Sequence, residues 1–322
     1  MISKDLIEHA LGTCLDDTSF LPLPNRKKGK VRDTYDLGEK LLLVTTDRQS
    51  AFDRILANIP FKGQVLNQVS AFWFGQTHDI VPNQVLEIPD PNVTVAKKCT
   101  VLPIEFVMRG YLTGSTDTSA WTQYSKGLRT ICGNDLPDGM KKNQKFDKPI
   151  LTPTTKSDLH DESISAGEIL KRGLIDPKTW KRCEEVVFGL FQRGTKIAAT
   201  HGLILVDTKY ELGLDATGTV TLIDEIHTPD SSRYWIAESY PARYQNDQEP
   251  ENIDKEFLRL WFKDHCDPYN DKILPEAPKE LVIELSSRYI RLYEMITGKQ
   301  FTVEPSVPVK ERMIKNLSKY MH

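Results

Sequence analysis

The order of strand and helix patterns along the chain predicts an α+β protein with two lobes. Strand patterns dominate the first third of the sequence, helical patterns follow residue 165, and a strand hairpin divides the later helices into two groups. A doubly wound parallel sheet would alternate strands with helices throughout. Because 322 residues exceed the size of one small domain, we expect a β-rich N-terminal lobe over residues 1–108 and an α+β lobe with extra C-terminal helices over 109–322.

The N-terminal lobe is expected to hold an antiparallel sheet and one long helix. Ser3 is a suitable N-cap for a short first helix, which should end by Gly12. Residues 37–40 contain a glycine and predict a hairpin turn between two apolar segments. The expected strands cover 31–36, 41–46 and 101–108, and the expected helix covers 63–74.

The second lobe is expected to begin with a long loop and to continue with helices around a hairpin. Residues 133–161 are rich in Gly, Pro, Asp, Asn and Lys and have no sustained periodicity, which is typical of a functional or mobile loop. Ser165 and Glu168 form a capping box, and Asp176 before Pro177 begins the next helix. The remaining expected elements are hairpin strands at 203–212 and 219–224 around a turn at 215–218, and helices at 275–297 and after residue 308.

Composition argues against several classes of protein. The 42 Lys and Arg residues nearly balance 45 Asp and Glu, and a net charge of −3 argues against general nucleic-acid binding. The five cysteines lie far apart without a Cys-x-x-Cys pair, so neither a disulfide framework nor a zinc site is expected. No apolar run has the length of a membrane span or a signal peptide. We expect a cytoplasmic monomer or homodimer that acts on small molecules, with neither nucleic-acid nor membrane partners.

A basic, glycine-containing segment precedes the first predicted strand. In Lys28-Gly29-Lys30-Val31-Arg32, the glycine would let backbone and ammonium groups approach a polyphosphate. The alternative is a solvated basic surface. The chain has no Walker-type phosphate loop, so a nucleotide site would have to be built differently.

The predicted hairpin carries the most distinctive charged residues. Asp207, Lys209 and Glu211 share one face of their strand. If the turn is centred on residues 216–217, Lys209 lies opposite Asp224 and Glu211 lies diagonally beside it. Two carboxylates and an amine suit Mg²⁺ and a transferred phosphoryl group. The alternative is an exposed sheet face with ordinary ion pairs.

Three further segments are candidates for anion or substrate binding. Residues 109–115, from Arg109 to Ser115, are expected to form a Gly-rich turn directly after an apolar strand. Residues 230–233 are expected to form a similar turn that ends in Arg233. Taken alone, each is better interpreted as a plain turn, but two such turns after candidate catalytic strands favour anion binding. Residues 156–162 place His160 among acids, where it could bind an amine or a metal or be structural, whereas His201 and His227 have no ligand-like partners by spacing and are expected to be structural.

Six segments, taken together, resemble the SAICAR synthetase family, in its longer, fungal-type form. They occur in the family's order and cover most of the chain up to about residue 240. The segments are KGKVRDTYD (28–36), TTDRQSAFD (45–53), EFVMRGYLTGS (105–115), TKSDLHDE (155–162), GLILVDTKYELG (202–213) and IDEIHTPDSSRYW (223–235).

The resemblance implies a fold, a reaction and a set of site residues. The fold would be two α+β lobes with a nucleotide cleft, related to kinases and ATP-grasp enzymes. The reaction would join L-aspartate to carboxyaminoimidazole ribotide, with ATP converted to ADP and phosphate and Mg²⁺ as cofactor, in purine biosynthesis. A kinase is a weaker alternative, because His-Arg-Asp and Asp-Phe-Gly motifs are missing, and a non-enzymatic nucleotide-binding module would not need both anion turns and the acidic hairpin.

The resemblance also implies roles for single residues. Glu211 and Asp224 would hold Mg²⁺, with Lys209 on the reacting group. The residues implied for ATP are Lys28, Lys30, Arg32 and Lys156, with Glu105 to Val107 as a hinge against adenine through its backbone. The residues implied for the ribotide and aspartate are Asp47, Ser50, Arg109, Ser115, Asp161 and Arg233.

Overall fold

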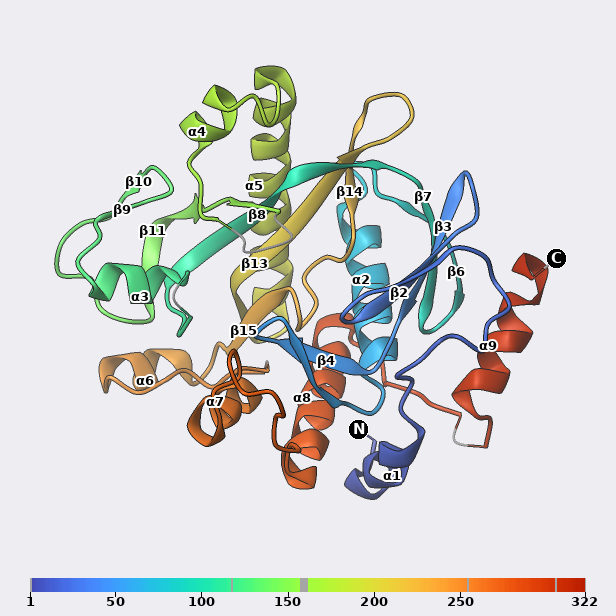
Figure 1. The fold of residues 1–322 in the computed structure, drawn as a ribbon. Helices are drawn as coiled ribbons and strands as arrows, with labels where there is room; N and C mark the ends of the chain where they lie inside the picture. The colour runs from blue at the N-terminus through green and yellow to red at the C-terminus, as the bar shows by residue number, and fades with distance from the viewer. Residues whose placement is uncertain (1, 117, 157–161, 254, 305, 322) are drawn as a thin grey trace.

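The computed structural model describes all residues except 1, 117, 157–161, 254, 305 and 322, and it is an α+β fold, as predicted (Figure 1). Within the described residues, two main antiparallel sheets follow one another along the chain. The first has the order β1-β2-β3-β7-β6, from β1 (Arg26–Lys28), β2 (Arg32–Asp36), β3 (Lys40–Thr45), β7 (Val93–Lys97) and β6 (Val85–Asp90).

The second sheet has the order β11-β8-β13-β14, with β12 also on β8 and β15 on β13. Its strands are β8 (Thr100–Leu112), β11 (Gln144–Leu151), β12 (Thr154–Thr155), β13 (Leu203–Leu214), β14 (Val220–Ile223) and β15 (Ser232–Ile236). Two small hairpins add β4 (Arg48–Ala51) with β5 (Arg54–Asn58), and β9 (Thr130–Ile131) with β10 (Asn134–Asp135).

Helices cover both sheets. The α-helices are α1 (Lys4–His9), α2 (Lys62–Thr77), α3 (Ala120–Ser125), α4 (Ala166–Lys171), α5 (Pro177–Thr200), α6 (Tyr240–Gln245), α7 (Glu256–His265), α8 (Lys279–Thr297) and α9 (Val309–Leu317), and short 3₁₀ turns follow α1 (Ala10–Thr13) and α9 (Ser318–Tyr320). The predicted caps are confirmed at Ser3, Ser165 and Asp176, whose side chains accept backbone N–H groups of the first helical turn. No helix in the described part of the chain combines the length and apolarity needed to cross a membrane.

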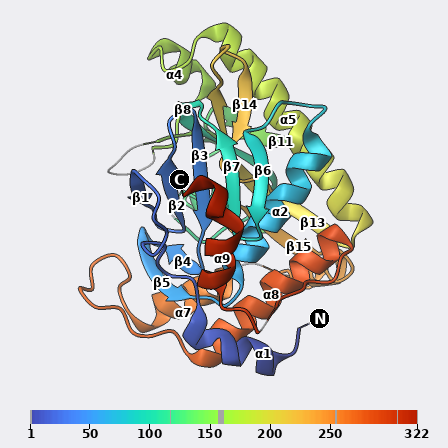
Figure 2. The ribbon, with the colours of Figure 1, turned by 90° about the vertical axis from the view of Figure 1, so that its right-hand side faces the viewer.

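The core explains how distant segments are joined. Helix α9 lies across the first sheet (Figure 2), where Met313 and Leu317 pack with Tyr35 and Val95. A larger cluster joins α2, α5 and α8 to both the second sheet and the small β4–β5 hairpin. On α5, Gly194 allows a close approach, since a Cβ there would lie 2.3 Å from His227. The C-terminal helices therefore belong to different clusters, with α9 on the first sheet and α8 beside α2 in the larger cluster.

Two expectations about local structure in the middle of the chain, the loop at 133–161 and the turn at Arg109, are corrected by the structure. The predicted loop 133–161 contains β11, a strand with an irregular register on β8, which explains why its sequence lacks clean periodicity. Strand β8 continues through Arg109 and Gly110 to Leu112, so Arg109 lies inside a strand rather than in a turn. The predicted lobe boundary between 108 and 109 also falls within β8, whose residues from Thr100 onward pair with β13.

Candidate active site

The β13–β14 hairpin carries the acidic centre, with a register one residue away from the predicted one. Glu211 pairs with Ile223, whereas a turn centred on 216–217 would have paired Lys209 with Asp224. Asp224 lies just beyond the end of β14, and its φ of 64° turns the backbone out of the strand. The two carboxylates thus reach the same region by a different geometry from the expected cross-strand pair.

The shape of the hairpin loop causes this shift. The Asp215 carboxylate accepts from the backbone N–H groups of Thr217 and Thr219 at 2.9 and 3.0 Å. The Gly218 N–H donates to the Asp215 carbonyl at 2.9 Å, and Gly218 has a φ of 78°. A β-turn followed by a left-handed glycine adds one residue to a two-residue hairpin loop. The loop is consequently centred on Thr217.

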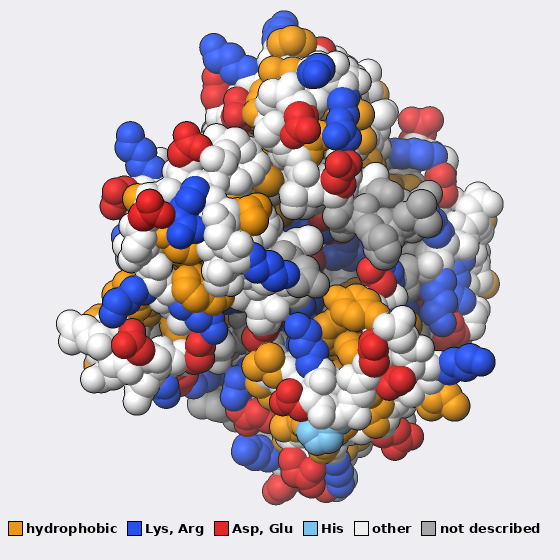
Figure 3. All heavy atoms as spheres, turned by 60° about the vertical axis from the view of Figure 1, so that its left-hand side comes forward, with side chains coloured by type: hydrophobic (Ala, Val, Ile, Leu, Met, Phe, Trp, Pro, Cys, Tyr) orange, Lys and Arg blue, Asp and Glu red, His pale blue; other side chains and the backbone are white. Residues whose placement is uncertain are grey.

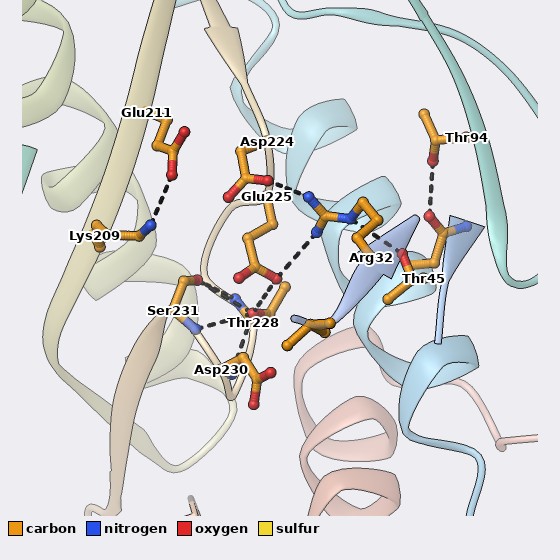
Figure 4. Close-up of polar contacts among 12 residues, drawn as sticks. Arg32, Thr45, Thr94, Lys209, Glu211, Asp224, Glu225, Thr228, Asp230 and Ser231 are labelled. Carbon is orange, nitrogen blue, oxygen red and sulfur yellow. Dashed lines mark hydrogen bonds and ion pairs between the residues drawn. The ribbon is translucent and has the colours of Figure 1, made fainter. Parts of the chain in front are cut away.

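Lys209 binds two carboxylates on neighbouring strands. Its Nζ lies 2.8 Å from Glu105 Oε1 on β8 and 2.7 Å from Glu211 Oε1 on its own strand. Lys156, which follows β12, binds the other oxygen of Glu211. Burial alone would lower the pKa of Lys209, but Glu211 and Asp224 outweigh burial and raise it. Lys209 is therefore a permanently charged ammonium facing a carboxylate (Figure 4).

Arg32 connects the first sheet with this acidic centre. Its guanidinium binds Asp224 and lies 3.6 Å from Glu225 (Figure 4). Burial favours the protonated form of Asp224, but the charge of Arg32, followed by that of Lys209, holds its pKa below the usual range. Burial raises the pKa of Glu225. Asp224 is therefore the more readily ionised member of this neighbouring pair.

Arg109 and Arg233 converge on a single carboxylate. Asp207 on β13 pairs with Arg109 on β8 and with Arg233 on β15, so the two arginines flank it from both sides. Arg233 binds the Asp207 carboxylate, and Arg109 Nη1 lies 3.8 Å from it. Arg109 Nε also donates to Thr152 Oγ1 at 2.8 Å. Two partly buried guanidinium groups that share one carboxylate retain capacity for a further anion.

Ser115 lies against helix α7, which the sequence did not single out. The Ser115 hydroxyl donates to Glu256, and its carbonyl accepts from Lys263 Nζ at 3.3 Å. Glu256 in turn lies 3.1 Å from Arg259 Nη1. Helix α7 therefore supplies charged groups on the side of the site where Ser115 lies.

The basic segment at residues 28–32 forms the turn between β1 and β2. Gly29 donates its N–H to the Arg32 carbonyl at 3.0 Å, and a Cβ at Gly29 would lie 2.4 Å from that oxygen, so this turn requires glycine. Lys28 and Lys30 are exposed on either side. Lys30 Nζ lies 2.5 Å from Asp53 at the tip of the β4–β5 hairpin.

The predicted residues Asp47 and Ser50 lie just before and within β4. Asp47 is buried, and its two oxygens accept the N–H groups of Leu15 and Gly63 at 2.7 and 2.8 Å. Burial raises the pKa of Asp47 to about 6. Ser50 lies half-buried in β4. Asp161 and His160 lie outside the described residues.

The expected adenine hinge is part of the second sheet. The Val107 carbonyl accepts the N–H of Thr152 at 2.8 Å and its hydroxyl at 3.2 Å, so a neighbouring segment occupies this backbone group. Glu105 joins the site through its carboxylate rather than its backbone. His227 is structural, as expected, because it is buried and burial lowers its pKa to about 3.

Sequence reasoning missed a buried ion pair beside the centre. Lys62 Nζ on α2 lies 2.7 Å from Asp230, and Lys255 and Tyr289 also contact this carboxylate. The available signal was a lysine within a mostly apolar helix face. The sequence could not identify its acidic partner, because Asp230 lies 168 positions after Lys62.

Glu211 and Asp224 are the candidate ligands for Mg²⁺ in this site. Among the described residues, no group of three or more His, Cys, Asp or Glu side chains forms a ready-made metal site. Mg²⁺ in nucleotide enzymes typically takes one or two carboxylates and completes its shell with water and phosphate oxygens. Glu211 and Asp224 supply that number, so the residues fit a metal that arrives with a polyphosphate.

These features define a class of protein. A lysine–carboxylate centre lies beside paired arginines on one sheet, and a glycine turn with exposed lysines approaches from another. This combination is suited to nucleotide-dependent group transfer to an anionic substrate.

Comparison with known proteins gives the family. The sequence model of SAICAR synthetase matches residues 25–275. A phosphoribosylaminoimidazole-succinocarboxamide synthase of Legionella pneumophila (strain Paris) is 58% identical over 309 residues, which cover 96% of this chain and 99% of the relative. A chloroplastic synthase of Arabidopsis thaliana is 56% identical over 317 residues, covering 97% of this chain and 77% of the relative.

Solved structures agree with the sequence comparison. A SAICAR synthase from Saccharomyces cerevisiae complexed with SAICAR has a TM-score of 0.74 at 32% identity, covering 90% of this chain and 99% of that chain. The chain therefore belongs to the SAICAR synthetase family, whose members are ATP-dependent ligases that join L-aspartate to carboxyaminoimidazole ribotide in purine biosynthesis.

Proposed function

We propose that this chain carries out the family's ligation on the face of β13 that presents Lys209 and Asp207. The proposal is supported by the position of two charged groups of residues on this one strand: the carboxylates around Lys209 and the arginines around Asp207. The two residues are two positions apart on one strand face, about 7 Å. The ammonium of Lys209 would hold the reacting carboxylate, while the arginines around Asp207 would hold another anionic group of the same ribotide.

We propose that the ribotide carboxylate is activated before the amine attacks. One carboxylate oxygen attacks the terminal phosphorus of ATP, the bond to the ADP oxygen breaks, and an acyl phosphate forms. The aspartate amine then attacks the acyl carbon and loses a proton, and inorganic phosphate leaves with that oxygen. Lys209 suits both steps because a fixed ammonium stabilises the oxygens on which negative charge develops.

Glu211 and Asp224 are the proposed Mg²⁺ ligands. When bound, the ion would neutralise charge on the ATP phosphates. Lys156 and Lys209 bind Glu211, and Arg32 binds Asp224, which keeps both carboxylates oriented toward the site.

The ATP phosphates are assigned to the basic side of the site. Lys28 and Lys30 are exposed beside Gly29, and Arg32 and Lys156 already bind the proposed metal ligands. A polyphosphate that enters between them would exchange these ion pairs for its own contacts. The adenine contact proposed for Val107 would have to use a part of the residue other than its carbonyl, because Thr152 already donates to that oxygen.

The ribotide is assigned to Arg109, Ser115 and Arg233, with Ser50 near its base. We assign Asp47 a structural role instead, because its two carboxylate oxygens accept the backbone N–H groups of Leu15 and of Gly63 at the start of α2. The role of Asp161 toward aspartate stays a prediction.

We place the boundary between the lobes near residues 98–99 instead of 108–109, since all of β8 belongs to the second sheet. Small molecules are the proposed partners. On the face in Figure 3, basic and acidic side chains are interspersed among the described residues, which is unlike a nucleic-acid surface. A cytoplasmic location, and a monomer or homodimer, stay predictions.

The test of the proposed function is ADP release measured while each substrate is omitted in turn. The expected result is full turnover only when ATP, Mg²⁺, the ribotide and L-aspartate are all present. A kinase acting on the ribotide would release ADP in the absence of aspartate at least as fast as in its presence. Equal ADP release with ATP and Mg²⁺ alone would contradict the proposal.

A further inference from the structure

Asp230 is the meeting point of four separate segments of the chain. It lies on the loop between β14 and β15, close to Glu225, Thr228 and Ser231 (Figure 4). Lys62 Nζ on α2 lies 2.7 Å from its Oδ2, and the Tyr289 hydroxyl on α8 donates to its Oδ1 at 2.6 Å. Lys255 Nζ, just before α7, lies 3.5 Å from the same Oδ1. This loop also leads from Asp224 to Arg233, so the cluster adjoins both parts of the proposed site.

The two lysines of this cluster differ in what they can still bind. The Lys62 side chain is 0% exposed and also donates to the Arg48 carbonyl at 3.0 Å, so it is fully engaged. The Lys255 side chain is 22% exposed and is only loosely paired at 3.5 Å. Lys255 is therefore the more accessible of the two ammonium groups that face Asp230.

Tyr289 and Lys255 contact the same oxygen of Asp230. The Tyr289 hydroxyl occupies Oδ1, the oxygen that lies nearest Lys255, and the Tyr289 side chain is 1% exposed, so water does not readily replace it. Burial would favour the protonated form of Asp230, but Lys255 and Lys62 outweigh burial and hold its pKa below the usual range. Asp230 is thus an anion that accepts a donor at each oxygen.

We propose that Tyr289 is a positioning residue that leaves the Lys255 ammonium available to an anionic group of the ribotide or of L-aspartate. Without the hydroxyl, Oδ1 draws Lys255 closer as its replacement donor, and the substrate loses part of that cation. Tyr289 lies beyond residues 25–275, which the family's sequence model matches, so the proposal gives α8 a role in the site. It rests on the proposed function, since it assumes that both anionic substrates bind beside β13.

The test is a double-mutant cycle of Tyr289→Phe and Lys255→Ala, with KM determined separately for ribotide, aspartate and ATP. With Lys255 present, Tyr289→Phe is expected to raise KM for ribotide or for aspartate by roughly five- to tenfold and to leave KM for ATP unchanged. The effect is smaller than full loss of a hydrogen bond to a charged group, because Lys255 is only drawn closer to Asp230. In the Lys255→Ala background the same change should alter that KM by less than about twofold, because the two residues act through one oxygen. Which KM responds identifies the substrate.

A matched control removes another hydroxyl from the same helix. Tyr293→Phe lies one turn further along α8, packs against Phe301, and is expected to change none of the three KM values. Equal effects of Tyr289→Phe in both backgrounds would show a packing role and overturn the proposal, as would a KM change for ATP alone or no change with Lys255 present. Wild-type ADP release that depends on both substrates keeps these outcomes distinct from failure of the proposed function.

Discussion

Replacing Glu211 with glutamine is expected to reduce kcat by roughly a hundred- to a thousandfold and to leave the protein folded. The scale is that of losing one fixed charge interaction at a reaction centre. Glutamine keeps the shape of the side chain but removes the charge that attracts Lys156, Lys209 and the proposed metal. The fold should persist because Lys209 retains Glu105 at 2.8 Å, and both lysines remain partly exposed to water.

The measurement is ADP release with all substrates across a Mg²⁺ titration, together with the melting temperature. Glu185→Gln is the control, since Glu185 is an exposed carboxylate on α5 paired only loosely with Arg182 at 3.7 Å, and it should keep wild-type turnover. Near wild-type activity of Glu211→Gln at every Mg²⁺ concentration would show that Glu211 is not a metal ligand.

Replacing Arg233 or Arg109 with alanine is expected to weaken ribotide binding by about one to two decades and to change ATP binding little. A charge-assisted hydrogen bond contributes roughly 1.5–3 kcal/mol, and each 1.4 kcal/mol is about tenfold. Removal of either arginine also leaves Asp207 with one cation instead of two, which adds repulsion toward an anion. Arg233→Lys should restore binding only in part, because lysine has no planar fork.

Binding titrations with ribotide and with ATP separately measure these effects. Arg193→Ala is the control, because Arg193 pairs with Asp79 on the surface, 2.8 Å away, outside the second sheet's charged face. If ATP binding falls while ribotide binding does not, the two subsites are assigned the wrong way round.

Local sequence signals predicted the long helices α2, α5 and α8, whereas several strands, among them β6, β7 and β15, were not predicted. The capping box at Ser165 and the Asp176–Pro177 start are confirmed because both depend on residues within one helical turn. The predicted register of the β13–β14 hairpin was wrong by one residue because Gly218, with a φ of 78°, follows the β-turn and lengthens the loop by one residue. Strand β11 was missed since its pairing with β8 is broken by a register shift between Lys145 and Ile150.

Only the part of the candidate site that is formed by residues close in sequence could be predicted. Lys209, Glu211 and Asp224 are close in sequence, so strand alternation brought them together in the prediction and in the structure. Asp230, Lys62 and Tyr289 are joined only by tertiary packing of α2 and α8 against one loop, which no local pattern encodes. The same limit applies to α7, whose contact with Ser115 crosses 141 positions from Ser115 to Glu256.

In the proposed reaction, the terminal phosphate of ATP passes to the ribotide carboxylate at the β13–β14 centre. Turnover with ribotide whose carboxylate carries ¹⁸O, followed by mass analysis of the inorganic phosphate, tests this transfer. We expect one ¹⁸O in each phosphate released, because the carboxylate oxygen that attacks phosphorus leaves with it. Phosphate without ¹⁸O, formed together with the succinocarboxamide, would contradict it.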